Sequence, residues 1–552
     1  MKLADKITKY KLDYLFVVLL WLVVFWNKWA NYALVDYVQS TFFDSIKQAY
    51  LNNFTYMFNL FDLGRLFFSI FGLLPYLFSF SILLGMIVSF FYIKKLFKDR
   101  GLLYSLLFAL IFFFNPFVYS RIMVGQIGVL LAYLFMPVSI YYIFGMIEKS
   151  DMKNVVKAVV AVTVSSLFSM QFFAFSLLFL LLGIIFIKRG KKKEWKKYIL
   201  FVVLILLLNA FWVQFFFTGN TVFSSIDSRH ENFFSPKMSA DIPAIAKVMG
   251  MWGFWRESSY LKSYSIFSLP VFYVMLSVLV ILMLMGVFFD SGKKKRFFFS
   301  LFWIGLILGV GASHPYTKPL FDFLFNNMPL FNGFRDSHKF VSLIVLAYAY
   351  FVPVAILEVK ERVKRTLTVV LLVAFVLLFT LPLINVGNQI RPVEYPKDYY
   401  DLNSYLDGQN VDGYIVYLPW QTYLTYNWTI STSSDGRIAV PINQIVHKNV
   451  IGGIDKYGGS DVLRDGITSC LENKSVSCLE NAGVQIVLLD KCAFYPESYS
   501  FLSNKAYSNS CFDVYKIDNK KSAEFSVPER FWIGLLASII SLIILAYFLL
   551  KK

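Results

Sequence analysis

The stretch GFRDSHKFVSLIVLAYAYFVPVAIL, Gly333 to Leu357, joins a cluster of ionisable residues to an apolar run. The run from Phe340 to Leu357 contains no charged residue. About 20 consecutive apolar residues in an α-helix cross the roughly 30 Å hydrocarbon core of a bilayer. Whether this run is one of many therefore decides the fold class.

Similar runs recur along the whole chain of 552 residues, of which 57% are hydrophobic and only 16% charged. A soluble fold of this size could not bury so much apolar surface. We predict an α-helical polytopic membrane protein with about twelve transmembrane helices. The expected spans are 12–30, 66–93, 101–115, 126–147, 155–170, 171–187, 198–217, 267–289, 297–312, 340–357, 366–386 and 531–550.

The net charge of +18 is concentrated in seven short segments, which hold 28 of the 53 basic residues and 8 of the 35 acidic ones. Threading twelve spans in order places all seven on one side, which the positive-inside rule identifies as cytoplasmic. We therefore expect a plasma-membrane protein with both termini in the cytoplasm, basic residues that contact membrane lipids, and no nucleic-acid partner. The segments are 1–11, 94–100, 148–157, 188–197, 290–296, 358–365 and 551–552.

A polar region, residues 387–528, precedes the last span and is predicted to be an extracytoplasmic α/β domain. YIVYLP (Tyr414–Pro419), VQIVLL (Val484–Leu489) and CFDVYKI (Cys511–Ile517) are typical of short strands, and KDYYDLNSYLD of a helix. The expected organisation is a transmembrane domain over 1–386, this α/β domain, and a C-terminal transmembrane helix within 529–552.

All four cysteines lie in this region, as an oxidising compartment favours. Three pairings are possible. We predict the disulfides Cys470–Cys478 and Cys492–Cys511.

Ionisable residues near the predicted outer face are few, so each is a candidate for function. Asp36 follows the first span, with Gln39 nearby. A carboxylate at the edge of the apolar slab has a raised pKa, which suits a general base. Helix capping or an ordinary interfacial charge is the alternative.

Two further clusters contain cations that suit an anion. In NPFVYSRIMVGQ, a turn between Pro116 and Gly125 would leave Arg121 and Gln126 at the outer rim, where Arg121 binds either a substrate phosphate or lipid head groups. In GFRDSHKF, the cations Arg335, His338 and Lys339 and the anion Asp336 precede a helix N-terminus, which favours an anion. An interfacial anchor is the alternative, although the positive-inside bias disfavours gratuitous cations on this face.

The loop 218–266 supplies Trp252 and Trp255, which suit a sugar or lipid head group or else mark the membrane interface. His230 and Glu231, like Asp36, are candidate ligands for a divalent cation such as Mg²⁺ or Mn²⁺, although no spacing here is diagnostic.

Three of these segments resemble a known superfamily. VDYVQSTFFDSIKQAYLNNFTYMFNLFDLG (Val35–Gly64) resembles the first external loop of bacterial YfhO-type membrane glycosyltransferases. FRDSHKF is similar to a stretch of the mycobacterial arabinofuranosyltransferases, and NPFVYSRIMVGQ to a loop of archaeal relatives. The YfhO-type enzymes and the arabinofuranosyltransferases belong to the glycosyltransferase C (GT-C) superfamily. The resemblance therefore implies a GT-C-like fold.

The resemblance further implies an enzyme that moves a sugar from a polyprenyl-phosphate donor, such as a dolichyl-phosphate sugar, to a glycan, glycolipid or glycoprotein acceptor. Asp36 matches the first-loop acid that deprotonates the acceptor. Arg335, His338 and Lys339 match the cluster that holds the donor phosphate, and Arg121 and Gln126 would line the donor groove. The chain has one first-loop acid rather than an adjacent pair, which leaves metal dependence open, and it lacks the long carbohydrate-binding modules of the arabinofuranosyltransferases.

Two other functions are compatible with the same spans. A transporter or flippase for lipid-linked glycans would carry ionisable residues deep within its spans, and the predicted spans are nearly uncharged at their centres. A catalytically silent scaffold would keep the same helices and present the α/β domain to a partner.

Overall fold

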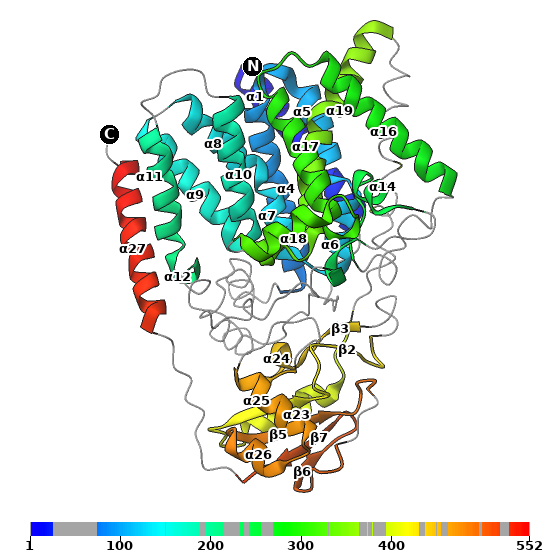
Figure 1. Cartoon of the computed structure of the whole chain (residues 1–552), viewed down its shortest axis with the longest axis vertical. Helices are drawn as coiled ribbons and strands as arrows, with labels where there is room; N and C mark the ends of the chain where they lie inside the picture. The colour runs from blue at the N-terminus through cyan, green and yellow to red at the C-terminus, as the bar shows by residue number, and fades with distance from the viewer. Residues whose placement is uncertain are drawn as a thin grey trace.

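The computed structural model consists of a helical part and a smaller α/β part (Figure 1). Both chain ends lie at the end of the helical part that points away from the α/β part, which we name the terminal end; the opposite end is named the sheet end. The structure describes residues 2–25, 74–149, 151–187, 195–213, 232–236, 242–255, 269–328, 331–363, 373, 378, 383, 393–429, 437–448, 450–453, 462–495, 499–518 and 529–550.

The helical part is built mainly from long apolar helices that pack around one hydrophobic core. Short 3-10 turns precede α19, the most buried of the candidate membrane spans: η6 (Gly311–Ser313), η7 (Phe331–Phe334) and η8 (Ser337–Phe340). The helices are α1 (Lys2–Phe25), α4 (Leu74–Leu96), α5 (Gly101–Phe113), α6 (Pro116–Val124), α7 (Ile127–Leu134), α8 (Met136–Glu148), α9 (Met152–Phe168), α10 (Gln171–Phe186), α11 (Trp195–Leu208), α12 (Ala210–Val213), α14 (Ala244–Met249), α16 (Leu269–Phe289), α17 (Lys295–Val310), α18 (Lys318–Asn327), α19 (Val341–Val363) and α27 (Glu529–Leu550).

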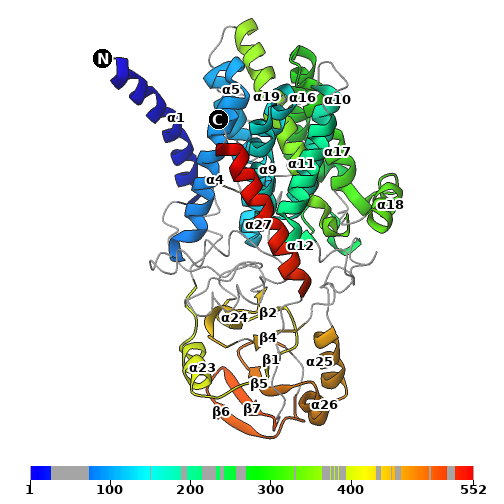
Figure 2. The same ribbon diagram turned by 90° about the vertical axis from the view of Figure 1, so that its left-hand side faces the viewer.

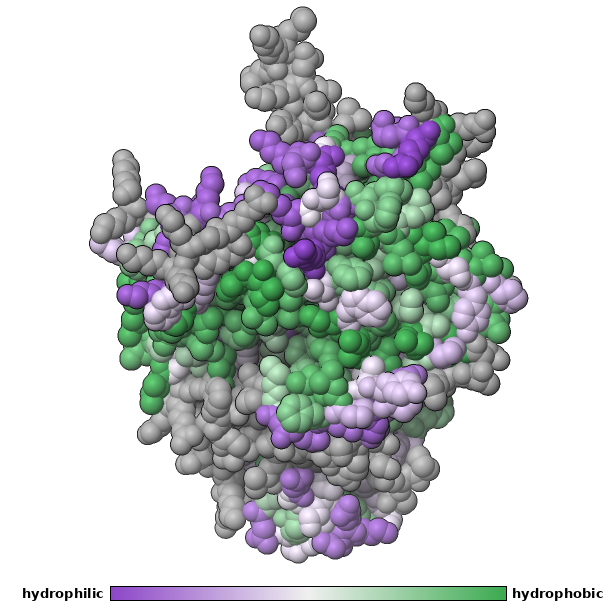
Figure 3. Space-filling view, turned by 45° about the horizontal axis from the view of Figure 1, so that its top comes forward, coloured by the Kyte–Doolittle hydropathy of each residue, from purple (hydrophilic) through white to green (hydrophobic). Residues whose placement is uncertain are grey.

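Within the described residues, five helical segments are long and apolar enough to cross a membrane, or six if the bent pair α5–α6 counts as one span. Shorter apolar helices cover Asp13–Phe25, Gln171–Phe186 and Trp532–Phe548. The chain is thus a multi-pass membrane protein, although the predicted number of twelve spans is not confirmed. Figure 3 shows a broad hydrophobic surface on the helical part below a hydrophilic rim, as a membrane-embedded bundle requires.

At the terminal end, one buried polar network joins three helices. The Arg100 guanidinium donates to Asp290 Oδ1 at 2.6 Å and to the Tyr350 hydroxyl at 2.7 Å, and that hydroxyl donates to Asp290 Oδ2 at 2.8 Å. Because each charged group is paired, its removal from water is compensated. The network fixes the start of α5, the end of α16 and the middle of α19.

The α/β part contains a five-stranded sheet in the order β4-β1-β5-β7-β6. The strands β4, β1 and β5 are parallel to one another, whereas β7 and β6 are antiparallel to their neighbours. A separate hairpin pairs β2 with β3. The strands are β1 (Tyr414–Leu418), β2 (Tyr423–Thr425), β3 (Arg437–Ala439), β4 (Val450–Ile451), β5 (Val484–Asp490), β6 (Lys505–Ser508) and β7 (Phe512–Lys516).

Helices cover both faces of this sheet (Figure 2). Alternate residues of β1 explain the arrangement: Ile415 and Tyr417 pack in the core beneath α23 (Lys397–Asp407) and α24 (Ile442–Ile445). Val416 and Leu418 pack in the core beneath α25 (Val462–Glu472) and α26 (Val476–Asn481). The three predicted strands and the predicted helix are confirmed, whereas the limits 387–528 of a separate domain stay a prediction.

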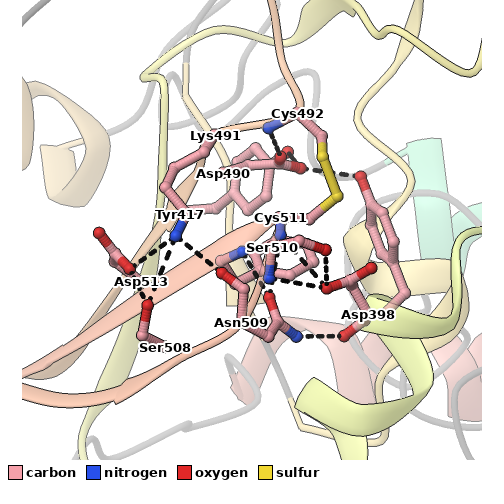
Figure 4. The surroundings of a disulfide bond; sticks show 12 residues. Asp398, Tyr417, Asp490, Lys491, Cys492, Ser508, Asn509, Ser510, Cys511 and Asp513 are labelled. Carbon is pink, nitrogen blue, oxygen red and sulfur yellow. Dashed lines mark hydrogen bonds and ion pairs between the residues drawn. A yellow bond between two sulfur atoms is a disulfide. The ribbon is translucent and has the colours of Figure 1, made fainter.

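The predicted disulfides are both present, with Cα–Cα distances of 5.3 Å for Cys470–Cys478 and 4.9 Å for Cys492–Cys511. The second lies beside the buried carboxylate of Asp490 (Figure 4). Asp490 accepts hydrogen bonds from the hydroxyls of Tyr417 at 2.6 Å and Tyr399 at 2.8 Å. Burial nevertheless dominates and raises the pKa of Asp490 to about 6.

A close helix contact gives the first prediction. A Cβ at Gly286 of α16 would lie 2.1 Å from the backbone oxygen of Phe351 in α19, whereas a Cβ at Gly145 of α8 would meet nothing within 4 Å. We expect Gly286→Ala to lower the free energy of unfolding by about 1–3 kcal/mol through overpacking. Gly145→Ala should be neutral or slightly stabilising. Thermal unfolding of the purified variants in one detergent checks this, and equal melting temperatures would contradict the packing.

The Asp490 pKa gives a prediction for pH. The Asp490 carboxyl holds its proton more tightly in the folded chain than in the unfolded chain. Its contribution to the free energy of unfolding is therefore fully present below about pH 4 and is lost as the pH rises through about 6. The free energy of unfolding should fall by about 3 kcal/mol in total over this range. Asp490→Asn should remove this fall. Hydrogen exchange of the β1 and β5 amides across this pH range, corrected for intrinsic rates, measures it; the same pH dependence in both proteins would exclude Asp490 as the cause.

Candidate functional site

The segment from Asn115 to Gln126 is a helix with defined ends, so the predicted turn between Pro116 and Gly125 is wrong. The Asn115 side chain accepts a hydrogen bond from the backbone N–H of Val118 at 2.9 Å, and Pro116 occupies the first helical turn. Gly125 ends α6 with φ +82°, a left-handed conformation that glycine adopts without strain. These caps produce a short helix, bent by 43° from α5.

Arg121 lies on this helix and is fully buried, whereas its predicted place at the outer rim of the membrane stays a prediction. One guanidinium nitrogen, Nη1, donates to Asp336 Oδ2 at 2.8 Å and also contacts Gln126 Oε1. The other, Nη2, lies 2.9 Å from His338 Nδ1. Arg121 therefore joins α6 to the GFRDSHKF segment through an ion pair that is shielded from water.

Aromatic rings surround this buried cluster. The Arg121 guanidinium carbon lies 5.1 Å from the ring centroid of Phe117 and 4.9 Å from that of Phe254. The His338 ring lies 5.3 Å and 5.7 Å from the same two rings. Cation–π attraction in this apolar setting adds to the ion pair. Among the described residues, Arg121 Nε and Asp336 Oδ1 still have no hydrogen-bond partner.

The GFRDSHKF segment is also held from two other sides. Ser337 Oγ donates to the backbone oxygen of Gly309 in α17 at 3.0 Å. Gln171 Nε2, at the start of α10, donates to the backbone oxygen of Gly333 at 3.0 Å, and its Oε1 accepts from Ser169. The predicted break near Ser169 to Gln171 thus exists, and it positions the polar segment.

The segment 242–255 forms a further wall at the sheet end. Trp252 is buried, and its ring contacts Tyr119 of α6 edge-on at 5.8 Å. Trp255 packs on Phe254 and Phe234, with centroids 5.7 Å and 4.7 Å away. The guanidinium carbon of Arg335 lies 4.8 Å from the Phe234 ring. Trp255 therefore packs on the two rings that lie against Arg121 and Arg335, whereas Trp252 packs on α6.

The cations of GFRDSHKF differ in exposure. His338 is fully buried and Lys339 is 9% exposed, whereas Arg335 is only half-buried. Burial raises the pKa of Asp336, but the charges of Arg121 and Lys339 together lower it more, so its pKa lies below the ordinary value and the carboxyl is ionised. Of the predicted phosphate ligands, Arg335 is the most accessible in this structure, whereas Arg121 and His338 are buried behind it.

Several predicted residues cannot be placed relative to this cluster. Asp36, Gln39, His230 and Glu231 lie outside the described residues, as does the first external loop. Within the part of the chain that the structure describes, no three acidic, histidine or cysteine side chains are grouped as metal ligands. The predicted divalent cation therefore stays a hypothesis.

From the sequence we did not predict that Lys247 is buried, or that the rings of Phe254 and Phe234 contact basic residues. Lys247 on α14 is only 3% exposed, and α14 packs against α17 at the sheet end. No local pattern in PAIAKVMG distinguishes a buried lysine from a solvated one. The two phenylalanines are separated from GFRDSHKF by about 80 residues or more, and only the tertiary structure brings their rings to Arg121 and Arg335.

No family model matches this chain, and no curated protein matches it. Among solved structures, the arabinofuranosyltransferase AftD from Mycobacteria is similar, with a TM-score of 0.63 at 10% sequence identity over 93% of this chain and 40% of AftD. A mutant of AftD gives 0.59 at 10% identity, over 93% of this chain and 42% of the mutant. ArnT from Cupriavidus metallidurans gives only 0.35 at 12% identity, over 94% and 100% of the two chains, which is too low to indicate a shared fold.

The chain thus spans about two fifths of the length of AftD. At 10% identity this likeness shows the fold alone. The chain has a GT-C-like fold, and the fold implied by the sequence resemblance is confirmed.

The buried ion pair gives the next prediction. Asp336→Asn would leave the Arg121 charge without its anion in a dry site, which typically costs about 3–5 kcal/mol. The control is Asp322→Asn, because Asp322 pairs with Lys318 at 3.0 Å but both side chains are about one third exposed; it should cost less than about 1 kcal/mol. Melting temperatures in detergent compare the two, and a similar loss from both would show that the buried pair has no special role.

Proposed function

We propose that this chain is a membrane glycosyltransferase that transfers a sugar from a polyprenyl-phosphate donor, such as a dolichyl-phosphate sugar, to a glycan, glycolipid or glycoprotein acceptor. The observation that carries the proposal is the half-buried Arg335, the most exposed basic residue of a segment that the buried Arg121–Asp336–His338 cluster supports. A guanidinium at the edge of an apolar bundle attracts a phosphate, because it binds two phosphate oxygens at once. A lipid phosphate fits this chemistry.

Arg335 and Lys339 are the proposed phosphate ligands. A guanidinium binds two phosphate oxygens at once, and an ammonium adds a point charge. Asp336 neutralises Arg121, so Arg121 is not one of the proposed phosphate ligands. Arg121, Gln126 and His338 would then position this segment, and Trp252 and Trp255 would shape the apolar wall beside the sugar.

The proposed reaction is an inverting displacement with Asp36 as the base. The Asp36 carboxylate takes the proton of an acceptor hydroxyl, and the hydroxyl oxygen forms a bond to the anomeric carbon of the donor sugar. The bond from that carbon to the phosphate oxygen breaks, and polyprenyl phosphate leaves with both electrons. Arg335 and Lys339 stabilise the charge that develops on the phosphate, where a low dielectric strengthens the interaction.

The proposed orientation follows the charge asymmetry. With the seven basic segments in the cytoplasm, the sheet end and the α/β part face outside, where a disulfide-forming compartment suits Cys470, Cys478, Cys492 and Cys511. Donor, acceptor and active site then meet on the outer face of the plasma membrane. A bound Mg²⁺ or Mn²⁺ would require ligands from segments such as Asp36, His230 and Glu231.

The test uses the purified full chain in nanodiscs with a labelled polyprenyl-phosphate sugar. Arg335→Gln should lower kcat/KM by about 10²–10³, as expected for loss of one cation at the developing charge. Lys318→Gln, which removes a charge from α18 outside the cluster, is the control and should leave kcat/KM unchanged. Asp36→Asn should abolish turnover but keep donor binding. Near-normal sugar transfer by Asp36→Asn or Arg335→Gln would contradict the role proposed for the residue that was changed. Movement of the lipid donor across the membrane without sugar transfer would favour a flippase.

A further inference from the structure

The short helix α18 exposes apolar side chains on one of its faces. Leu320 is 46% exposed and Phe323 is 61% exposed, and because they are three residues apart they lie on the same face. Tyr316 just before the helix and Met328 just after it are exposed as well. We name these four residues the apolar patch. Large apolar side chains that gather on one surface mark a contact with a partner or a membrane.

Another face of α18 packs on the protein. Phe321 is fully buried and Phe325 is nearly so. The ring of Phe321 lies 5.4 Å from the ring of Phe331 in η7, and the ring of Phe331 lies 5.5 Å from that of Phe334, which precedes Arg335. A row of aromatic rings therefore joins α18 to the GFRDSHKF segment, while the apolar patch stays exposed.

A membrane span leads directly into α18. This span contains α17, which exposes Trp303 and Ile307 and ends at Val310. The Thr317 hydroxyl donates to the Gly311 carbonyl at 2.7 Å, so α18 begins close to the point where α17 ends. Both views show α18 near the sheet end of the bundle, at a level between the two ends of α27 (Figures 1 and 2). The apolar patch thus lies at the level of the apolar helices.

The polar groups of α18 fit the boundary between hydrocarbon and lipid head groups. Lys318 and Asp322 form an ion pair of 3.0 Å, and both side chains are about one third exposed. Asn327 in the last turn donates to the carbonyl oxygen of Phe323 at 2.8 Å, so part of its amide is satisfied within the helix. A short helix that combines an apolar face with charges on its flank is typical of a helix that lies in the membrane interface. Tyrosine, as at position 316, is enriched there.

We propose that the apolar patch of α18 inserts into the lipid layer at the sheet end, at the boundary between acyl chains and head groups. The partner is the lipid surface, because a membrane span leads directly into α18 and the patch lies at the level of the apolar helices. Since Phe321 joins α18 to η7, the inserted helix fixes the depth of the GFRDSHKF segment in the membrane. The inference rests on the multi-pass membrane fold and not on sugar transfer, so either can fail without the other.

The test attaches a fluorophore to a single new cysteine in the full chain, in phosphatidylcholine nanodiscs. All four native cysteines form disulfides, so the new thiol is the one that reacts. Phe323→Cys puts the label on the apolar patch, and the adjacent Asp322→Cys is the matched control on the flank of α18. Lipid that is brominated near the glycerol end of its acyl chains should quench the Phe323→Cys label, and aqueous iodide should not. The Asp322→Cys label should show the reverse.

Two outcomes would overturn the insertion. The first is equal quenching of both labels by iodide, which would place the apolar patch in water. The second is protection of the Phe323→Cys label from iodide and from brominated lipid alike, which would show that a second copy or another protein covers the patch.

A second measurement tests whether α18 holds the GFRDSHKF segment in place. The double variant Leu320→Ser with Phe323→Ser removes apolar groups from the patch. Hydrogen exchange of the amides of residues 331–340 in nanodiscs should then become faster by about tenfold or more, since tenfold corresponds to roughly two methylene groups withdrawn from lipid. The matched control is Ile281→Ser with Leu284→Ser on α16, where both side chains are 54% exposed; it should leave these rates unchanged. Equal exchange rates in the two double variants would overturn the anchoring role of α18.

Discussion

The ion pair between Arg121 and Asp336 joins segments that lie 215 residues apart, and the arrangement of the sheet end depends on it. Two charges in a dry interior are costly unless they meet, so α6 and the GFRDSHKF segment can pack only in the register that pairs them. The same contact brings His338 between Phe117 and Phe254. Arg335 then remains near the accessible side of the segment, beside the Phe234 ring. The proposed phosphate ligand Arg335 thus belongs to a segment that the structural ion pair of Arg121 holds in place.

Each end of the helical part contains an arginine paired with an aspartate, but the two arrangements differ. At the terminal end, Arg100, Asp290 and Tyr350 form a closed network that joins three helices. At the sheet end, Arg121 and Asp336 are paired, but one nitrogen and one oxygen of this pair have no partner among the described residues, and Arg335 stays half-buried. The first arrangement fits a structural role. The second is the site of the proposed phosphate binding, and it keeps two polar atoms without a partner among the described residues.

Apolar periodicity and strand composition carried most of the fold prediction, because both are local properties. The break at Ser169–Gln171, the strands β1, β5 and β7, the helix α23 and both disulfides follow from such signals. Arg121 shows where local signals fail. Its neighbours Pro116 and Gly125 suggested a turn, whereas they lie at the two ends of a buried helix. The burial of this arginine is explained by its ion pair with Asp336, which lies 215 residues away. The contacts of Phe234 and Phe254 with Arg335 and Arg121 likewise join distant segments.

We propose that the GFRDSHKF segment binds a lipid phosphate while the Arg121–Asp336 ion pair stays closed. The decisive measurement is a structure of the full chain with a bound polyprenyl-phosphate sugar. We expect phosphate density within hydrogen-bonding distance of Arg335 and Lys339, with the Arg121–Asp336 ion pair intact. Phosphate density at another site, or bound to Arg121 in place of Asp336, would contradict it.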